Sequence, residues 1–528
     1  MTRTGGELVV EALHCYGVST VFGIPGVHNL PIYEALRQQP AIRHILARHE
    51  QGAAFMADGY ARASGRPGVA LVTSGPGALN TLTPLGEAYT DSSPVLVIAT
   101  NVERRLLETR RGTLHELRDQ PGAFRAVIGN CERVLAAADL IPAFQRVWST
   151  LTGGRPRPAA MDIPFDVLDD ETGVDLLPLP ARRCAMPKQE DLRRAAALLR
   201  DAQRPLIYAG GGAIGAGDAL TALAERLSAP VLTSVKGKGV IPEDHPLALG
   251  FLGPVRGPLA GYFRECDVVL AVGTRFAGSM AANWQAPIAR SLIRVDADAA
   301  ELSGVVTPTV ALLADARCAL EALSAELGPG AKPADPALVA LKQQAQREAR
   351  ATAPWRTAVL DAVRAALPRD GILSVDMTMV GYQANTTYPA YAPHTLLVPS
   401  GFGTLGFALP VAIGAKAAVG SRPVVALVGD GGFQFTMQEV ATAIQHRLGV
   451  AILLVNDNSY TAVRRGQERR YGKNTAVDLV NPDFQQLARA YGIEAELVAE
   501  PSGLSPALQR AFERDLPTLV EIVAPDQG

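Results

Sequence analysis

One pattern occurs three times along the 528 residues and restricts the possible folds more than any other feature. Each copy begins with Arg-Pro, continues with an apolar run of strand length and ends in a glycine-rich turn; the copies start at Arg66, Arg204 and Arg422. Proline is tolerated at the start of a strand, and glycine allows a sharp turn after its end. Helix-period segments alternate with such runs throughout the chain, which favours parallel sheets covered by helices on both faces.

Two stretches interrupt this alternation and divide the chain. Asp166 to Pro187 is acidic and contains proline, and Leu327 to Pro354 has Gly-Pro-Gly-Ala-Lys-Pro-Ala-Asp-Pro near its start. Both compositions are typical of linkers. We therefore predict an α/β protein of three doubly wound parallel-sheet domains, over residues 1–165, 188–326 and 355–528.

Charge and composition restrict the class of partner. The chain has 50 basic and 52 acidic residues, with no long run of either sign, so we expect no nucleic-acid and no membrane partner. No apolar run reaches the roughly 18 residues that a membrane span needs. We expect a cytoplasmic protein that acts on a small molecule. Because the five cysteines are scattered and none form a Cys-x-x-Cys pair, we expect neither a disulfide framework nor a zinc site.

Oxygen-bearing side chains follow two successive predicted strands in the third domain. Gly429-Asp430-Gly431-Gly432 follows the strand 424–428, and Asn456-Asp457-Asn458 follows the strand 450–455. Asp430, Asp457 and a nearby backbone carbonyl could hold Mg²⁺ against a diphosphate, because Mg²⁺ prefers oxygen ligands that it shares with phosphate. Glycines let the backbone approach the anion, which the following helix N-terminus attracts. Taken alone, Gly-Asp-Gly can equally be an ordinary strand-to-helix turn.

The spacing resembles the signature of thiamine-diphosphate enzymes, in which Gly-Asp-Gly is followed by Asn-Asn. Asn456 and Asp457 stand 26 and 27 residues after Asp430. Asp457 replaces the usual Asn, and its carboxylate is at least as good a donor for Mg²⁺. The resemblance implies that the magnesium ligands are Asp430, Asp457 and the backbone carbonyl of Ser459. It also implies cofactor contacts at Gly429, Asp430, Gly431, Gly432, Asp457 and Tyr460.

A second resemblance lies near the N-terminus. Residues 42–47 are predicted to form a strand, and Glu50 follows at the start of a helix, where a carboxylate is favourable in any protein. His49-Glu50-Gln51-Gly52-Ala53, followed by Ala57-Asp58-Gly59-Tyr60-Ala61-Arg62, resembles the pyrimidine-binding domain of the acetolactate synthase and benzoylformate decarboxylase superfamily. The resemblance implies that Glu50 both binds the pyrimidine and promotes formation of the nucleophilic ylid.

Further segments extend the resemblance over essentially the whole chain: 22–26, 73–77, 91–94 and 400–410. Leu405 matches the bulky apolar residue that supports the bent cofactor, and Thr378 is a weaker candidate contact. The other cofactor contacts implied are Pro25, Gly26, Glu50, Thr73, Gly77 and Gly403. Family members place the pyrimidine domain of one subunit against the diphosphate domain of another, which implies a homodimer or homotetramer with active sites at the subunit interface.

The resemblance implies decarboxylation of a small 2-oxo acid to an enamine, which is then protonated or captured by a second carbonyl compound. Where acetolactate synthases carry Phe-Gln-Glu, this chain has Leu114-His115-Glu116, and their lysine and pocket tryptophan correspond to Asn130 and Gly466. We therefore predict a non-oxidative decarboxylase, with His115 and His28 as catalytic candidates for proton transfer. Solvated loop positions would also explain both histidines. An acetolactate-synthase-like carboligase and a non-catalytic cofactor-binding paralogue stay as alternatives.

Two further expectations concern ligands. The stretch 114–120 resembles decarboxylases of 5-guanidino-2-oxopentanoate, whose guanidinium could pair with Glu116, Asp119 or Glu468. In the central domain, the segments 210–212 and 267–275 could hold FAD, as some relatives do. We favour a central domain without FAD.

Overall fold

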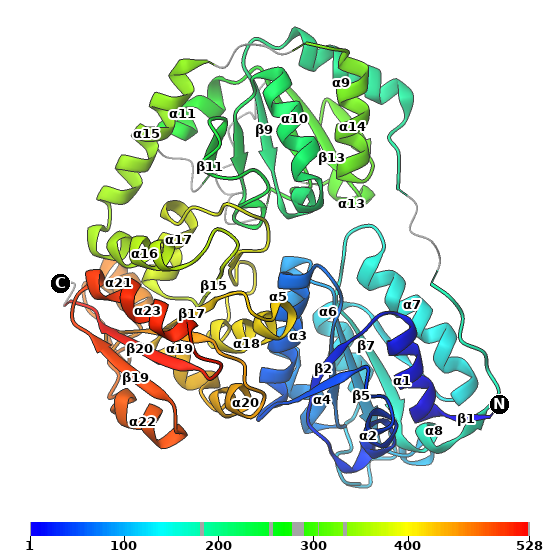
Figure 1. Cartoon of the computed structure of the whole chain (residues 1–528). Helices are drawn as coiled ribbons and strands as arrows, with labels where there is room; N and C mark the ends of the chain where they lie inside the picture. Colours follow the sequence, from blue (N-terminus) through cyan, green and yellow to red (C-terminus); the bar gives the residue numbers. More distant parts are fainter. Residues whose placement is uncertain are drawn as a thin grey trace. The chain divides into compact units, whose positions relative to one another are not determined.

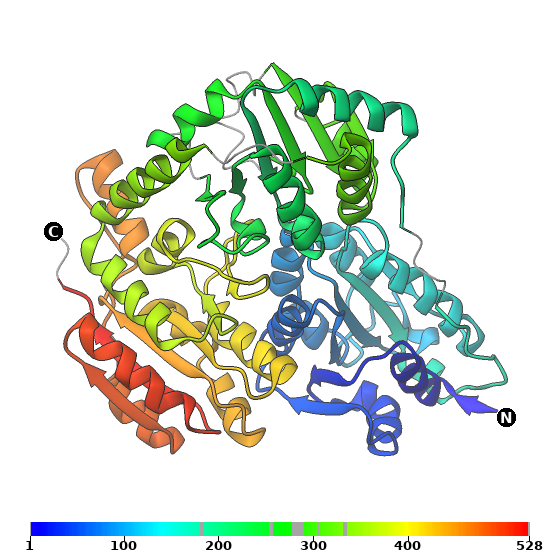
Figure 2. The same cartoon turned by 45° about the horizontal axis from the view of Figure 1, so that its top comes forward.

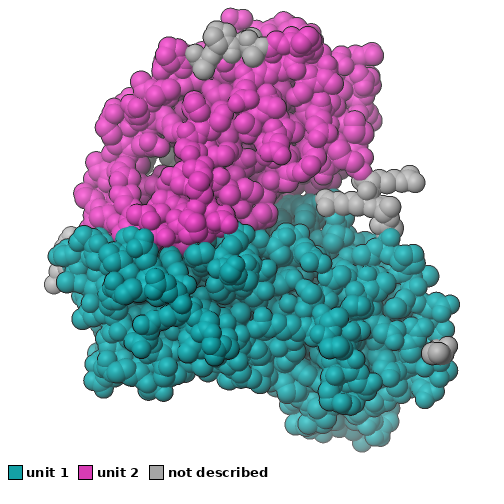
Figure 3. Space-filling view, in the orientation of Figure 1, with its two compact units in different colours: residues 1–181, 372–378, 399–528 teal, residues 182–371, 379–398 magenta. Residues whose placement is uncertain are grey.

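The computed structural model describes residues 2–179, 184–252, 257–276, 290–304, 306–330 and 335–525. The chain forms two compact units (Figure 3): unit 1 comprises residues 1–181, 372–378 and 399–528, and unit 2 comprises residues 182–371 and 379–398. Three parallel sheets form the frame, two in unit 1 and one in unit 2, and helices flank each of them (Figure 1). The predicted α/β class with three parallel sheets is therefore confirmed.

The first sheet of unit 1 has the strand order β3-β2-β4-β5-β7-β6, and its neighbouring strands pair in parallel. The strands are β2 (Thr20–Gly23), β3 (Arg43–Leu46), β4 (Gly68–Val72), β5 (Val95–Asn101), β6 (Cys131–Arg133) and β7 (Ala159–Pro164). Three helices pack an apolar core against one face of this sheet: α1 (Gly5–Cys15), α2 (Leu30–Arg37) and α7 (Leu140–Thr152). The other face is covered by α3 (Glu50–Ser64), α5 (Leu82–Asp91) and α6 (Gln120–Ile128), as Figures 1 and 2 show.

The second sheet of unit 1 contains five parallel strands in the order β15-β17-β18-β20-β19. The strands are β15 (Ile372–Val375), β17 (Val424–Gly429), β18 (Ala451–Asn456), β19 (Glu494–Val498) and β20 (Thr518–Val523). Its helices are α18 (Ala408–Val419), α19 (Asp430–Thr436), α20 (Glu439–Gln445), α21 (Thr461–Tyr471), α22 (Phe484–Tyr491) and α23 (Leu504–Phe512). The predicted strands 424–428 and 450–455 match β17 and β18 to within one residue, and β17 and β18 are neighbours.

Helices α3 and α18 form the most extensive contact between the two halves of unit 1. A Cβ added at Gly59 would overlap the carbonyl of Val411, and a Cβ at Gly414 would overlap the carbonyl of Met56. The backbones can therefore approach only because both helices carry glycine at the contact. Helix α18 is buried along its first eight residues, which is typical of a helix inside a core.

Unit 2 has the sheet order β11-β10-β9-β12-β13-β14, again parallel. The strands are β9 (Pro205–Ala209), β10 (Val231–Thr233), β11 (Ala248–Phe251), β12 (Val268–Val272), β13 (Ser291–Asp296) and β14 (Val310–Leu313). Helices α9 (Gln189–Asp201), α10 (Gly217–Leu227) and α14 (Ala316–Leu327) bury one face. Helix α11 (Gly257–Glu265) packs against the other face of this sheet. Among the described residues of the whole chain, no helix is both long and apolar enough to span a membrane.

The second segment expected to be a linker contains a long helix. Helix α15 (Pro336–Ala351) begins at the N-cap Asp335, whose side chain accepts from the backbone N–H of Ala337. Leu338 and Leu341 pack against the cores on either side of the sheet in unit 2. The segment was predicted to be a linker because glycine and proline are concentrated near its start, before this helix. Residues 180–183 and 331–334 of the two expected linkers lie outside the described residues.

The expectation of unpaired cysteines is wrong for one pair. Cys184 and Cys318 form a disulfide although 134 residues separate them in sequence. The segment before α9 runs beside the start of α14, where the backbone N–H of Asp315 donates to the carbonyl of Ala185 at 3.0 Å. Only the tertiary path of the chain brings the two thiols together, so their spacing in the sequence carried no signal.

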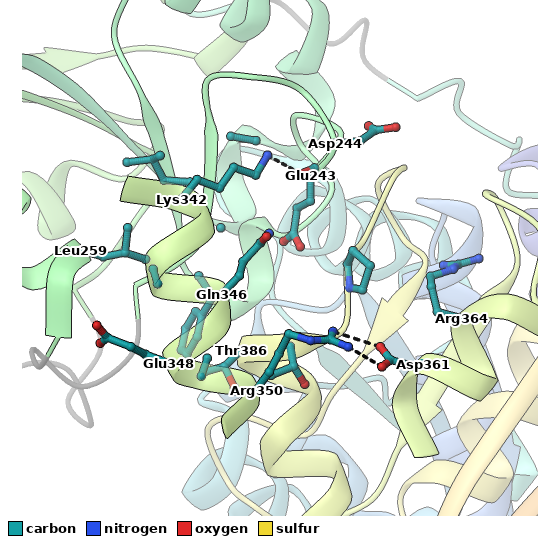
Figure 4. A pocket seen from close by; sticks show the side chains of 18 of the residues that line it. Glu243, Asp244, Leu259, Lys342, Gln346, Glu348, Arg350, Asp361, Arg364 and Thr386 are labelled. Atoms are coloured by element: carbon teal, nitrogen blue, oxygen red, sulfur yellow. Dashed lines mark hydrogen bonds and ion pairs between the residues drawn. The ribbon is translucent and has the colours of Figure 1, made fainter. Parts of the chain in front are cut away.

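A cavity of about 980 Å³ lies in unit 2, beside β11, α11 and α15 (Figure 4). Four of its charged side chains form two ion pairs within the lining. Arg350 pairs with Asp361 and Arg369 pairs with Asp244, while Lys342 donates to two backbone carbonyls. These pairings balance the charge of the cavity from within and join α15 to the helix α16 (Pro354–Ala366).

Substitution of the glycines at the α3–α18 contact should test this packing. Gly59→Ala and Gly414→Ala should each lower the free energy of unfolding by about 2 kcal/mol or more, because the added methyl group overlaps backbone that cannot move independently. Gly466→Ala is the matched control, since its Cβ would meet no atom within 4 Å inside the helix α21. That control should be neutral or stabilising by about 0.5–1 kcal/mol. Chemical denaturation measures all three, and unchanged unfolding of the first two variants would contradict the packing.

Candidate active site

The loop 73–77 at the carboxyl end of β4 organises the N-terminal half of the candidate site. Gly75 has φ of 60°, and its N–H donates to Oε1 of Gln120 at 2.9 Å. A Cβ on Gly75 would lie 2.6 Å from the carbonyl oxygen of His115, and a Cβ on Gly77 would lie 3.4 Å from Oε1 of Glu50. One loop therefore lies beside two of the residues that the sequence singled out.

Two histidines meet at the same loop. Nδ1 of His28 lies 2.6 Å from Oγ of Ser74, and Nδ1 of His115 lies 3.2 Å from the same oxygen. The ring of His28 also stacks on Phe165, with centroids 5.0 Å apart and planes 4° apart. The residues come from the ends of β2, β4 and β7 and from the loop after β5, because parallel strands bring all their carboxyl ends to one edge.

The environment of His28 favours its neutral form. Burial lowers the pKa of His28, the neighbouring His115 lowers it further, and the carboxylate of Glu103 raises it. An imidazole whose pKa lies below its ordinary value near 6.5 is mostly neutral at pH 7 and can accept a proton.

Glu50 is the first residue of α3. The N-cap residue His49 accepts from the backbone N–H of Gln51 through Nδ1 at 3.1 Å, and Oε2 of Glu50 accepts from the side-chain amide of Asn80 at 2.9 Å. Its charge is close enough to Tyr33 to add to the effect of burial in raising the pKa of that phenol. Asn80 was not singled out from the sequence.

A buried carboxylate on α20 supports the start of α3. Glu439 accepts from the backbone N–H of Arg48 at 3.1 Å and from the hydroxyl of Thr442 at 2.7 Å. Burial raises the pKa of Glu439 to about 7, and these hydrogen bonds oppose that rise. The two halves of unit 1 thus meet two residues before Glu50.

Asp430 and Asp457 lie at the carboxyl ends of the neighbouring strands β17 and β18. Nδ2 of Asn481 lies 2.6 Å from Oδ2 of Asp430, 3.1 Å from Oδ1 of Asn456 and 3.0 Å from Oδ1 of Asn458. An amide nitrogen has two hydrogens, so three oxygens around it exceed what it can satisfy. Burial raises the pKa of Asp430, and the neighbouring charge of Asp457 adds to the rise.

The other residues expected near the diphosphate lie around the same loop. The methyl group of Thr378 would be 3.1 Å from a Cβ at Gly429, and the ring of Tyr460 would be 2.6 Å from a Cβ at Gly431. The hydroxyl of Ser459 is buried and has no hydrogen-bond partner among the described residues. The carboxylate of Asp457 accepts from the hydroxyl of Thr461 at 2.5 Å.

The loop that bears Leu405 is fixed by two buried carboxylates that the sequence did not reveal. Gly403 and Gly406 have φ of 72° and 76° and frame Leu405. Glu87 accepts from the N–H of Gly403 at 2.9 Å, and Asp376 accepts from the N–H of Ala408 at 3.3 Å. Burial raises the pKa of Asp376 to about 6, against the backbone hydrogen bonds that favour its charge. Their partners are backbone groups, which explains why no side-chain motif marked them.

The three carboxylates considered for a guanidinium already have local partners. Glu116 accepts from the backbone N–H groups of its own loop, at Arg110 and Gly112, which lowers its pKa. Asp119 caps the N-terminus of α6, and Glu468 accepts from the side chain of Asn474.

Two of the expected cofactor contacts lie in the loop after β2. Pro25 is exposed, and Gly26 lies directly against Thr73.

Comparison with known proteins agrees with this arrangement. The N-terminal TPP binding domain of thiamine pyrophosphate enzymes matches residues 3–123, the central domain matches residues 192–323, and the C-terminal TPP binding domain matches residues 376–522. The probable 2-ketoarginine decarboxylase AruI of Pseudomonas aeruginosa is 41% identical over 99% of this chain and 94% of its own length. The probable acetolactate synthase large subunit of Methanocaldococcus jannaschii is 34% identical over 98% and 91%. The large subunit of acetolactate synthase isozyme 2 of Escherichia coli is 34% identical over 98% and 95%. The chain therefore belongs to the thiamine pyrophosphate enzyme family, in the superfamily of 2-oxo acid decarboxylases and acetolactate synthases.

Proposed function

We propose that the chain is a thiamine-diphosphate- and Mg²⁺-dependent decarboxylase that converts a 2-oxo acid into CO₂ and an aldehyde. One observation carries the proposal: the imidazoles of His28 and His115 both contact the hydroxyl of Ser74. Ser74 lies in the loop 73–77, and the end of this loop at Gly77 lies beside Glu50. Release of an aldehyde consumes one proton for each 2-oxo acid anion cleaved. Histidine is the side chain best suited to supply that proton near neutral pH.

The residues in the second half of unit 1 fit Mg²⁺ and a diphosphate. Asp430 and Asp457 are two nearby carboxylates, and further amide oxygens converge on the same point at Asn481. A hard divalent cation would offset the repulsion between the carboxylates and take up the excess oxygen donors. Asp430, Asp457 and the carbonyl of Ser459 would hold the ion, and the glycines 429–432 would admit the diphosphate at the start of α19.

The residues in the first half fit the aminopyrimidine. Glu50 presents a carboxylate at the start of α3, and the hydroxyl of Thr73 is buried with no hydrogen-bond partner among the described residues. Gly26 and Gly77 both lie close to Thr73, so that a Cβ on either glycine would crowd its side chain. The missing side chain of Gly77 also leaves space beside Glu50. Glu50 would hold a hydrogen bond to a ring nitrogen and keep the exocyclic nitrogen in its proton-accepting form.

Bound thiamine diphosphate supplies an electron sink that makes loss of CO₂ from a 2-oxo acid possible. The protein contributes placement and proton movement. Glu87 and Asp376 hold the loop of Leu405 in one conformation through its backbone, so that an apolar side chain supports the cofactor from a fixed point. His28 and His115 hold the proton that becomes the aldehyde hydrogen.

Protonation distinguishes this proposal from acetolactate formation, in which a second 2-oxo acid takes the place of the proton. Both kinds of relative are similar to the chain at 34–41% identity, so overall similarity does not choose between them. The two buried or half-buried imidazoles favour protonation.

A guanidino-bearing 2-oxo acid is the substrate that we propose. Support comes from the 41% identity to a protein described as a probable 2-ketoarginine decarboxylase. Glu103 is a carboxylate close enough to His28 to affect its pKa, and it lies on the loop after β5 that also bears His115. It pairs with Arg105 of the same loop, a guanidinium that shows which chemistry this carboxylate can bind.

We also propose that two copies of the chain complete each site. Among the described residues, Glu50 accepts from Asn80, and Asp430 accepts from Asn481 and from the backbone N–H of Gly431. No side-chain hydrogen bond between described residues joins these two sets within one chain, which agrees with a site assembled from two subunits.

A panel of 2-oxo acids tests the reaction directly. The guanidino 2-oxo acid should release CO₂ and the aldehyde one carbon shorter, only with thiamine diphosphate and Mg²⁺, and faster than pyruvate or benzoylformate. Coupled aldehyde detection and mass spectrometry of the products are the measurements. Formation of a 2-hydroxy-3-oxo acid as the main product would show that the chain is a carboligase, and no turnover despite cofactor binding would indicate a non-catalytic paralogue.

Glu50→Gln should lower kcat by about 100-fold or more, because the amide cannot play the part of the carboxylate in the proton transfer. The unfolding temperature should stay unchanged. Glu34→Gln is the control, since Glu34 is an exposed carboxylate on α2 that pairs with Arg37 on the surface. Turnover of Glu50→Gln at the level of that control would remove Glu50 from the mechanism.

The metal site can be tested without turnover. Asp430→Asn should weaken Mg²⁺-dependent binding of thiamine diphosphate by about tenfold or more, since it removes the buried carboxylate. Asp457→Asn restores the residue usual in the family and should stay within a few-fold of wild type. Isothermal calorimetry at several Mg²⁺ concentrations measures both. Equal loss in the two variants would mean that Asp457 is not interchangeable with Asn here.

A further inference from the structure

The hydroxyl of Ser74 lies between two imidazole nitrogens in a place that water does not reach. Ser74 is 0% exposed and His28 is 7% exposed. The distances from its Oγ are 2.6 Å to Nδ1 of His28 and 3.2 Å to Nδ1 of His115, and the ring centroids are 5.5 Å apart. The hydroxyl therefore faces the same atom of both rings.

Hydrogen counting restricts how these three atoms can be protonated. A hydroxyl has one hydrogen to donate and two lone pairs to accept. If neither Nδ1 carries hydrogen, the hydroxyl can donate to only one ring. If both carry hydrogen, the hydroxyl accepts twice and its own hydrogen is left without an acceptor in a buried place, which is costly. Only one arrangement satisfies all three atoms: one Nδ1 protonated and the other bare.

We propose that Ser74 is a proton relay that makes His28 and His115 share one transferable proton. This inference rests on the proposed function, because it names how the decarboxylase delivers the proton that its product requires. In one state Nδ1–H of His115 donates to Oγ, and Oγ–H donates to Nδ1 of His28. When Nε2 of His115 takes up a proton from solvent, both hydrogens can move one step along the chain. His28 then becomes the imidazolium with Nδ1 protonated, His115 is left neutral with its hydrogen on Nε2, and the hydroxyl is reversed with no atom gained or lost.

The surroundings give the relay a direction. His115 is half-buried in the loop after β5, whereas His28 is buried and stacked on the apolar ring of Phe165. A proton from solvent can therefore enter at His115 and pass through Ser74 to His28. The carboxylate of Glu103 raises the pKa of His28 and so favours its charged form, against the effects of burial and of His115. The other nearby carboxylate, Glu116, accepts from the backbone of its own loop instead.

The tautomers of the two histidines in the wild-type protein test the relay. The full-length protein with its cofactors, labelled with ¹⁵N only at its eight histidines, gives the protonation of each ring nitrogen by long-range ¹H–¹⁵N correlation. His28→Gln and His115→Gln assign the signals. At a pH where both rings are neutral, the two rings should show opposite tautomers, one with Nδ1–H and one with Nε2–H. The same tautomer on both rings would overturn the relay.

Ser74→Ala removes the hydroxyl and adds no volume. It should lower kcat for aldehyde formation by about tenfold or more, change the pH profile of kcat, and leave both KM and the affinity for thiamine diphosphate within about twofold. The control is Ser93→Ala, since Ser93 is also buried and its hydroxyl has no hydrogen-bond partner among the described residues. An unchanged kcat and pH profile in Ser74→Ala would overturn the relay.

Failure of the relay and failure of the proposed function give different results. If the wild-type protein releases no aldehyde from any 2-oxo acid, the proposed function is wrong, and the tautomers still decide whether the histidines share a proton. If the wild type is active and its two histidines show the same tautomer, the function stands and the relay is wrong.

Discussion

Parallel pairing of strands is the constraint on which the rest of this structure depends. Each connection in a parallel sheet must return across a face of the sheet, so the carboxyl ends of all its strands lie along one edge. In the first sheet this edge gathers the residues that follow β2, β3, β4, β5 and β7, among them His28, Glu50, Ser74 and His115. In the sheet of β17 and β18 it gathers Asp430 and Asp457.

Much of this could be predicted from the sequence, because glycine turns and apolar runs are local signals. The strands before Gly75 and Gly429 were predicted from such runs, and the spacing from Asp430 to Asp457 indicated the second site. Contacts to backbone groups and contacts between distant segments left no such signal. Glu87 and Asp376 bind the N–H groups of the Leu405 loop, and Cys184 meets Cys318 only through the tertiary path. Ser74 was visible only as part of a family motif.

The two halves of unit 1 use buried charge in different ways. The cluster of Asp430 and Asp457 concentrates oxygen donors beyond what Asn481 can satisfy, which suits a divalent cation. The first half instead places two titratable rings on either side of one hydroxyl, which suits movement of a proton. The two halves are joined where α3 packs on α18 through glycines. The backbones of the two helices touch there, and the contact leaves no room for a larger side chain at Gly59 or Gly414.

Proton exchange at C2 of bound thiamine diphosphate measures directly whether this chain activates the cofactor through Glu50, and it needs no substrate. Wild-type protein is mixed with D₂O in the presence of thiamine diphosphate and Mg²⁺, quenched with acid, and analysed by ¹H NMR for loss of the C2 hydrogen. If Glu50 activates the cofactor, exchange in the wild type should be much faster than in the free cofactor, and exchange in Glu50→Gln should be close to the rate of the free cofactor. Slow exchange in the wild type, with the cofactor shown to be bound, would rule out this role of Glu50.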